Sequence, residues 1–346
     1  MKSILRREFL CLSFLALTLP FFPGVFAAEI NDAEWRFGVV PDTQWFPANM
    51  PPSYGTAIHV IDAINQEMIR QKVDFVIQVG DLADKSSAIA FQTRAAHNQS
   101  LKDAGIRFYP VRGNHDSADL EAVGQFKAAF PNLPGNEGCE GSSPNLPGAQ
   151  GMTYSFTHKG GKFVLLDTFP VFDDKTEKGK VYTVRDFLPW INEQLEEKDH
   201  RFAMVFAHKN LLGQNHKDTV FGGVDQDSPQ DVQNAFYASL QKNNVKYFMS
   251  GHDHVYNRSN IKSPDGESEV GQIICGSASH KFYTPKPPFM DREEILVQEL
   301  NRVGFLIVHV NRQGIKVEYF STEPFGQEPF SSQWEVRDTF GYEFDH

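Results

Sequence analysis

The scarcity of cysteines and the absence of a long apolar run argue against two structural classes, and the composition argues against a third. Among 346 residues there are three cysteines, and they form no framework of regular spacings, so a small disulfide-stapled fold is excluded. Hydrophobic residues make up 40% and charged residues 22%, which argues against a disordered or low-complexity chain. The apolar run Phe9–Phe22 is shorter than the roughly 20 residues that a membrane-spanning helix needs. One disulfide between Cys139 and Cys275 is conceivable in an oxidising compartment, but a buried free Cys275 is favoured.

The first 27 residues have the pattern of an export signal. Lys2, Arg6 and Arg7 precede the apolar run, and Val25-Phe26-Ala27 supplies small residues at a cleavage site. The segment Arg6–Leu10 further resembles a twin-arginine signal, whose pathway exports folded proteins. We therefore expect a protein of the periplasm, with no stable membrane insertion after cleavage. An uncleaved membrane anchor is the alternative.

Positive charge is scarce in the remaining chain. Without residues 1–27 it has 30 Lys and Arg against 43 Asp and Glu, a formal net charge of −13. Such a chain repels polyanions over most of its surface, so we expect no extended nucleic acid as a partner. Bound divalent cations would offset part of the negative charge.

Short apolar runs alternate with helical patterns from Trp35 onward, which predicts an α/β fold. We expect strands at 37–40, 75–79, 108–111, 202–207 and 247–249, helices at 55–71 and from about 82 to 104, and hairpins at 154–166 and 305–320. No linker separates two cores, so residues 28–346 are predicted to form a single domain. Insertion loops are expected near 131–151, 211–227 and 281–300, and such loops usually determine specificity.

Polar residues of the types that bind metals recur where the predicted strands end. These residues are Asp42, Asp81, Asn114, His208, His252 and His254. In open α/β sheets, functional sites form at the carboxyl ends of the strands. Two carboxylates, an amide and three imidazoles brought together there would make a mixed nitrogen and oxygen site for one or two divalent metal ions.

These residues stand in sequence blocks that resemble those of the calcineurin-like metallophosphoesterases. The blocks are Asp42-Thr43-Gln44, Gly80-Asp81-Leu82-Ala83-Asp84, Gly113-Asn114-His115-Asp116, the isolated His208 and Gly251-His252-Asp253-His254. The resemblance covers residues 36–260 and implies a four-layer α/β/β/α sandwich of two mixed sheets flanked by helices.

The resemblance also implies a role for each of these residues. Asp81 would bridge two divalent cations; Asp42, Gln44 and His254 would complete the first site, and Asn114, His208 and His252 the second. Two cations roughly 3.5–4 Å apart can turn a shared water into a bridging hydroxide that attacks phosphorus in line with the departing oxygen.

Two further residues are implied as catalytic. His115 would protonate or stabilise the leaving group, and Asp84 would orient the His115 ring. Asp84 as a simple cap of the following helix is the alternative. His216 and His280 are more simply read as loop histidines, although their loops can reach the site.

The chain departs from the family pattern at two positions. The family usually has His where Gln44 stands, and a neutral amide oxygen favours Mn²⁺, Mg²⁺ or Fe²⁺ over two Zn²⁺ ions. A Gln44 that does not bind a metal is the alternative. Lys85 follows Asp84 at a position where some members have an Arg that contacts phosphate. Asp84 itself stands where purple acid phosphatases have a Tyr ligand, so Fe(III)–tyrosinate chemistry is not expected.

The sequence therefore predicts an exported binuclear-metal hydrolase of small phosphate esters. It does not separate a phosphomonoesterase from a phosphodiesterase. The alternative is a non-catalytic relative that retains the scaffold and binds a metal or ligand, and Gln44 is the feature that favours it.

Overall fold

The computed structural model describes residues 34–45, 55–118, 121–173, 178–223, 229–286, 291–322 and 332–344. The predicted export signal, residues 1–27, lies outside these ranges. The chain from residue 32 onward forms one compact unit. Among the described residues, no helix has both the length and the apolar character needed to cross a membrane.

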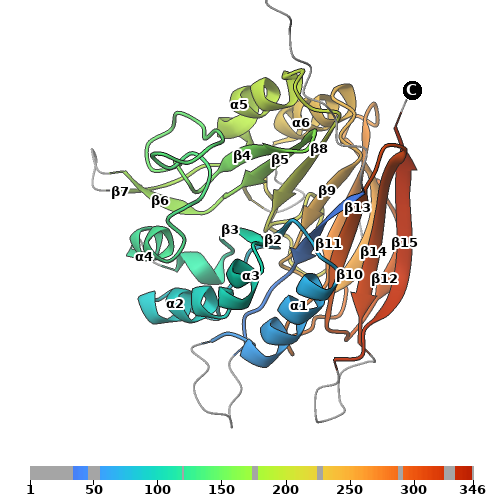
Figure 1. Ribbon diagram of the computed structural model, residues 1–346. Coiled ribbons are helices and arrows are strands. Elements are labelled where there is room, and N and C mark those ends of the chain that lie inside the picture. Colours follow the sequence, from blue (N-terminus) through green and yellow to red (C-terminus); the bar gives the residue numbers. More distant parts are fainter. Residues whose placement is uncertain are drawn as a thin grey trace, which may run out of the picture. The chain divides into compact units, whose positions relative to one another are not determined.

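The first of two large sheets combines parallel and antiparallel strands (Figure 1). Its strand order is β15-β14-β13-β1-β2-β3, formed by β1 (Trp35–Val40), β2 (Phe75–Val79), β3 (Arg107–Val111), β13 (Gly304–Val310), β14 (Gly314–Ser321) and β15 (Glu335–Glu343). Strands β1, β2 and β3 are parallel, whereas β13 joins β1 in antiparallel register. The parallel strands place the residues that follow them at one edge of the sheet.

The second sheet has seven strands in the order β12-β10-β11-β9-β8-β5-β4. They are β4 (Tyr154–His158), β5 (Gly161–Leu166), β8 (Phe202–Ala207), β9 (Tyr247–Ser250), β10 (Tyr256–Lys262), β11 (Glu269–Cys275) and β12 (Glu293–Glu299). Neighbours from β5 through β8 and β9 to β11 are parallel. A separate hairpin pairs β6 (Pro170–Asp173) with β7 (Lys178–Val181).

Aromatic side chains fill the space between the two sheets. Phe37 of β1 and Phe75 of β2 stack with ring centroids 5.1 Å apart, and the Phe163 ring of β5 packs edge-on against both at 5.2 and 5.1 Å. Because side chains alternate along a strand, Gly38 and Val40 face the opposite side of the first sheet. There a Cβ on Gly38 would collide with Met68, so the glycine lets a helix lie close to the strand.

Helices cover the outer faces of both sheets (Figure 1). They are α1 (Ile58–Arg70), α2 (Ala88–Ala96), α3 (Gln99–Asp103) and α4 (Glu121–Ala129) with the first sheet, and α5 (Val184–Glu196) and α6 (Gln230–Lys242) with the second; the short 3₁₀ turn η1 (His115–Ser117) follows β3. The buried residues of α1 pack with those of β13 in a second hydrophobic cluster. The architecture confirms the predicted four-layer α/β/β/α sandwich of two mixed sheets.

Two local predictions differ from the structure. The helix expected to run to about residue 104 is divided into α2 and α3, because the His97 carbonyl accepts a hydrogen bond from Asn65 Nδ2 (2.7 Å) and leaves the helical pattern. The insertion loop expected near 281–300 contains strand β12, which pairs with β10 along the edge of the second sheet. Its mostly exposed apolar residues show no alternating burial, so periodicity gave no strand signal.

Both cysteines in the described residues are free, and Cys275 is buried.

Candidate metal centre

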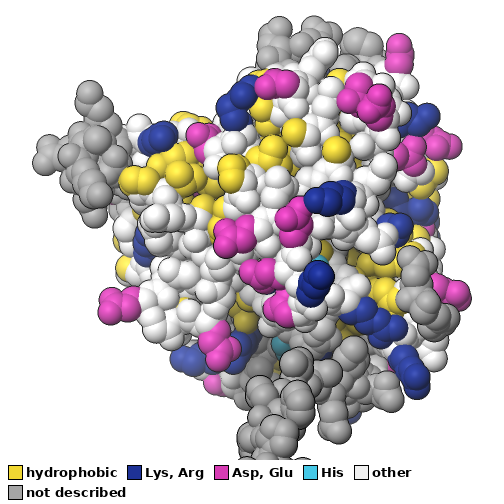
Figure 2. Space-filling view, turned by 90° about the horizontal axis from the view of Figure 1, so that it is seen from above, with side chains coloured by type: hydrophobic (Ala, Val, Ile, Leu, Met, Phe, Trp, Pro, Cys, Tyr) yellow, Lys and Arg dark blue, Asp and Glu magenta, His cyan; other side chains and the backbone are white. Residues whose placement is uncertain are grey.

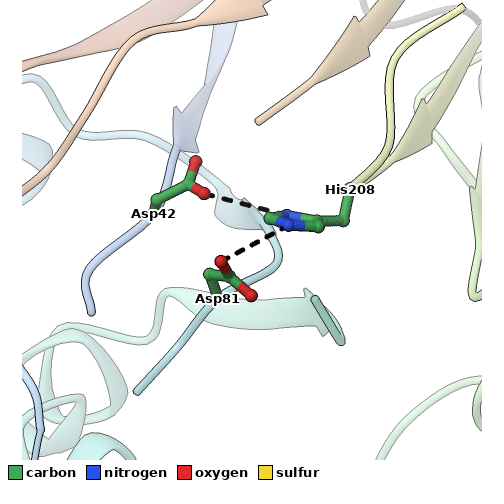
Figure 3. A group of neighbouring side chains, drawn as sticks. All are labelled: Asp42, Asp81 and His208. Atoms are coloured by element: carbon green, nitrogen blue, oxygen red, sulfur yellow. Dashed lines mark ion pairs between the residues drawn. The ribbon is translucent and has the colours of Figure 1, made fainter. Parts of the chain in front are cut away.

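The carboxyl ends of strands from both sheets meet at one place. Asp42 follows β1, Asp81 follows β2 and Asn114 follows β3, whereas His208 follows β8 and the pair His252 and His254 follows β9. These six residues and Gln44, the seventh predicted ligand, are thereby brought into one cluster. Figure 3 shows His208 reaching toward Asp42 and Asp81 from the facing sheet.

Glycines make this close approach possible. A Cβ at Gly113 would collide with the Asp81 carboxylate, and one at Gly251 would collide with the Asp42 carboxylate. His252 and His254 adopt positive φ angles of 72° and 49°, which non-glycine residues rarely do. Strain of this kind persists where the surrounding structure imposes it, commonly at functional sites.

One group of side chains gathers around His208. Its Nε2 atom lies 2.9 Å from Asn114 Oδ1, 3.4 Å from Asp81 Oδ2 and 3.2 Å from His252 Nδ1. His208 and Asp81 are buried.

A second group gathers around His254. Its Nε2 atom lies 3.4 Å from Asp42 Oδ1 and 2.9 Å from Gln44 Nε2. The Gln44 Oε1 atom is buried, and no group in the described part of the chain forms a hydrogen bond with it. Because an unpaired buried carbonyl is costly, the amide of Gln44 is suited to a cation bound beside His254.

Each of the three histidines is fixed by a hydrogen bond from its other ring nitrogen. His208 Nδ1 donates to the Val79 carbonyl (2.9 Å), His254 Nδ1 donates to the Lys281 carbonyl (2.8 Å), and His252 Nε2 donates to Asp218 Oδ1 (3.0 Å). Metal-ligating histidines characteristically make such bonds, which fix the tautomer and the ring orientation. The lone pairs of His208 Nε2 and His252 Nδ1 therefore face each other, an arrangement that a bound cation would relieve.

The electrostatics of the carboxylates favour a cation as well. Burial, reinforced by the charge of Asp81, raises the pKa of Asp42 well above its usual value, although two backbone N–H contacts from His252 (3.0 and 3.2 Å) oppose the rise. Burial also raises the pKa of Asp81, against the opposing effect of His115. Burial lowers the pKa of His208 and of His254, so both imidazoles are held in the neutral form that metals bind. The donor set fits divalent metal ions.

His115 lies at the edge of this cluster with about a quarter of its side chain exposed. Its backbone N–H donates to Asp81 Oδ1 (3.0 Å), and its Nδ1 donates to the Asp84 backbone carbonyl (2.7 Å). The Asp84 carboxylate is farther from the ring, at 3.6 Å. The pair predicted as catalytic is thus brought together, with the closer contact made by the backbone of Asp84.

Two acidic residues within the sequence blocks tie the loops of the site together. Asp116 accepts backbone hydrogen bonds from Leu82 (3.0 Å) and Gly113 (2.9 Å), which join the loops that follow β2 and β3. Asp253 accepts backbone hydrogen bonds from Gln214 and His216, at 2.5 and 2.9 Å. The loop after His208 is thereby held against the turn that contains His252 and His254.

Sequence reasoning missed two residues at this site. Asp218, bonded to His252, lies in the 211–227 segment, whose Asp-rich composition directly after His208 was the only signal. Lys281, whose ammonium lies 3.4 Å from His115 Nε2, lies in a segment that has no recognisable motif. His216 does reach the site and stacks on His252 (4.2 Å), whereas His280 packs against Trp45 (4.5 Å).

The comparisons with known proteins agree with this geometry. The sequence model of the calcineurin-like phosphoesterase family matches residues 36–256. No curated protein matches the chain.

Solved structures with the same fold include three that align over most of this chain. A purple acid phosphatase from yellow lupin seeds has a TM-score of 0.59 at 15% identity, covering 92% of this chain and 55% of that one. GAP50, the anchor in the inner membrane complex of Plasmodium, has a TM-score of 0.54 at 15% identity, covering 90% of each chain. A dimetal phosphatase from Danio rerio has a TM-score of 0.50 at 13% identity, covering 90% of this chain and 99% of that one. Similarity at this level of identity shows a shared fold.

Proposed function

Because the chain belongs to the calcineurin-like phosphoesterase family, we propose that it is an exported hydrolase of small phosphate esters that uses two divalent metal ions. The observation that carries this proposal is the arrangement of His208, His252 and His254. In each ring, one nitrogen donates a hydrogen bond to an acceptor outside the cluster. The other nitrogen faces a carboxylate, an amide or another ring of the cluster.

The side chains divide into two ligand sets. Asp42, Gln44 and His254 form one set around the His254 Nε2 atom, whereas Asn114, His208 and His252 form the other around the His208 Nε2 atom. Asp81, beside His208, is the carboxylate assigned to both metals. When bound, the two cations would activate a water molecule and neutralise charge on the phosphate oxygens.

His115 is assigned to the leaving group. The Asp84 carbonyl holds its Nδ1–H, so the ring presents Nε2 to the open side of the cluster. When the ring also carries a proton on Nε2, it can pass that proton to the departing ester oxygen and keep its Nδ1–H on the Asp84 carbonyl. Asp84 acts as the residue that orients the ring.

The identity of the bound metals is proposed from Gln44. An amide oxygen in place of an imidazole makes the first site harder, so Mn²⁺, Fe²⁺ or Mg²⁺ is favoured over a pair of Zn²⁺ ions. The buried Oε1 atom, which lacks a hydrogen-bond partner among the described residues, supports Gln44 as a ligand.

The proposed substrate is a small organic phosphate ester. Export through a twin-arginine signal is proposed from residues 1–27 and would place the enzyme in the periplasm. Acidic and basic side chains are interspersed on the face shown in Figure 2, and its coloured residues form no continuous basic stripe for a nucleic-acid backbone.

The alternative is a non-catalytic relative that binds a metal or ligand. The structural similarity to GAP50, described as an anchor, and the unusual Gln44 are the observations in its favour. The presence of His115 beside the cluster supports an enzyme, because a protein that only bound metal would not need it.

A substrate panel tests the proposed function. The protein without residues 1–27 is reconstituted with Mn²⁺ and assayed on aryl phosphomonoesters, phosphodiesters and nucleotides. Turnover that needs added metal supports the enzyme. Stoichiometric metal binding with no turnover of any ester supports the non-catalytic alternative.

A further inference from the structure

The segment that follows β11 folds back across the metal centre. The Ala278 backbone N–H donates to the Asp42 carbonyl at 3.0 Å. The Lys281 carbonyl accepts hydrogen bonds from His254 Nδ1 (2.8 Å) and Ser277 Oγ (2.9 Å). The backbone of Lys281 is therefore held by two residues that belong to the proposed metal site or adjoin it.

The side chain of Lys281 extends from this fixed backbone to the open edge of the cluster. Its Nζ atom lies 3.4 Å from His115 Nε2 and 5.6 Å from the centre of the Tyr283 ring. The backbone N–H of His115 donates to Asp81 Oδ1 at 3.0 Å, so the ammonium group lies beside a residue that is joined to the metal cluster.

The basic residues that adjoin the sequence blocks of the site are paired with a carboxylate or exposed. Lys209 Nζ lies 3.2 Å from Asp218 Oδ2, and Arg112 forms a buried ion pair with Asp167 at 2.7 Å. Lys85, which stands where some relatives have a phosphate-binding Arg, is exposed. Across the described ranges of the chain, no carboxylate lies within 4.0 Å of Lys281 Nζ. Within those ranges the positive charge beside His115 has no carboxylate partner, so it is suited to an anionic ligand.

We propose that Lys281 is a substrate-binding residue, whose ammonium group binds an oxygen of the phosphate group undergoing hydrolysis. The proposal rests on the proposed function, because it places the phosphate between the two metal-ligand sets and His115. In some relatives an Arg at the position of Lys85 contacts phosphate. In this chain we assign that contact to Lys281 and not to Lys85.

The test uses inorganic phosphate, the common product of phosphomonoester hydrolysis. Phosphate is titrated by calorimetry into the Mn²⁺-loaded wild type and the Lys281→Met variant, with metal content measured in both. Loss of one charge-assisted contact should weaken phosphate binding about 10- to 100-fold while metal content stays unchanged. Lys286→Met is the matched control, because the Lys286 side chain is exposed on the same segment, and it should bind phosphate like the wild type.

A second pair of variants covers the case in which Lys281→Met loses metal or stability. Lys281→Arg should retain most of the phosphate affinity, and Lys281→Gln should lose it. The proposal is overturned if Lys281→Gln binds phosphate with the wild-type affinity. It is also overturned if phosphate affinity is lost in Lys85→Met instead. If the wild type binds phosphate but hydrolyses no ester, the proposed function fails. The phosphate affinities of the wild type and the Lys281 variants then still test whether Lys281 binds phosphate. If esters are hydrolysed and Lys281→Gln keeps the wild-type KM, the inference alone fails.

Discussion

The Nδ1 atom of His252 lies 3.2 Å from the Nε2 atom of His208. The remaining nitrogen of each ring donates to an acceptor, Asp218 for His252 and the Val79 carbonyl for His208. In their neutral forms the two facing nitrogens therefore both present lone pairs. A cation between them would turn a repulsive contact into two favourable ones.

Removal of metal should consequently destabilise the fold. A ligand present at a hundred times its Kd stabilises the native state by about 2.7 kcal/mol, so the melting temperature should fall in EDTA and recover when Mn²⁺ is added. Differential scanning calorimetry measures the change. The difference in melting temperature between EDTA and Mn²⁺ should shrink in His208→Gln. It should persist in His309→Gln, because His309 is a strand residue that contacts Glu318. An equal melting temperature in EDTA and in Mn²⁺ would contradict the account.

Asp218 should set metal affinity without touching the metal. Its carboxylate holds the Nε2–H of His252, and loss of such a partner typically weakens metal binding by about 10- to 100-fold. Calorimetric titration of Mn²⁺ into metal-free Asp218→Asn measures the effect. Asp231→Asn, which alters an exposed contact with Arg185, is the matched control and should bind Mn²⁺ like the wild type. Equal affinity in the two variants would remove Asp218 from the site.

The same carboxylate predicts a pH dependence in the metal-free protein. Burial alone would raise the pKa of Asp218, but the hydrogen bond from His252, together with the charge and hydrogen bond of Lys209, outweighs burial, so its pKa lies below the usual 3.8. A lowered folded-state pKa contributes stability above pH 3.8 that is lost as the pH falls through the folded value.

The measurement for this dependence is the difference in urea midpoint between the wild type and Asp218→Asn, with EDTA present. The wild type should be more stable at pH 6, and its advantage should shrink below about pH 4, where an unfolded Asp becomes protonated. If the stability difference in favour of the wild type increased as the pH fell, the result would contradict a lowered pKa of Asp218.

Export should depend on the paired arginines of the N-terminal segment. Changing Arg6 and Arg7 to Lys keeps the positive charge but removes the twin-arginine pattern, so the protein should remain in the cytoplasm. Fractionation followed by immunoblotting measures the distribution, with Lys2→Arg as the charge-neutral control. Normal export of the double variant would exclude the twin-arginine route.

The parts of the fold with buried parallel strands were the most predictable from sequence. Strand β2 occupies the predicted residues 75–79, and β8 the predicted residues 202–207, because their largely apolar runs are buried on both faces. Strand β12 was not predictable, since it lies at a sheet edge and its burial does not alternate. The end of α2 depended on a hydrogen bond from Asn65, which is distant in sequence.

The candidate site shows the same division. Asp42, Asp81 and Asn114 were predictable, because residues after neighbouring parallel strands must lie at one edge of the sheet. Asp218 and Lys281 come from long loops, whose paths depend on contacts such as the backbone hydrogen bond from Ala278 to Asp42. No local pattern encodes such a path, so these two residues required the structure.

The most direct test of the central claim combines metal content with turnover in wild type and Asp81→Asn. Mass spectrometry of the reconstituted protein gives the metal stoichiometry, and hydrolysis of an aryl phosphate gives the rate. The account predicts two metal ions and metal-dependent turnover in the wild type. In Asp81→Asn, which removes the carboxylate assigned to both metals, turnover should fall by at least about a thousandfold, equivalent to roughly 4 kcal/mol of barrier. Asp103→Asn, on an exposed helix end, should keep the wild-type rate. A wild-type rate in Asp81→Asn, or turnover that persists without metal, would contradict the account.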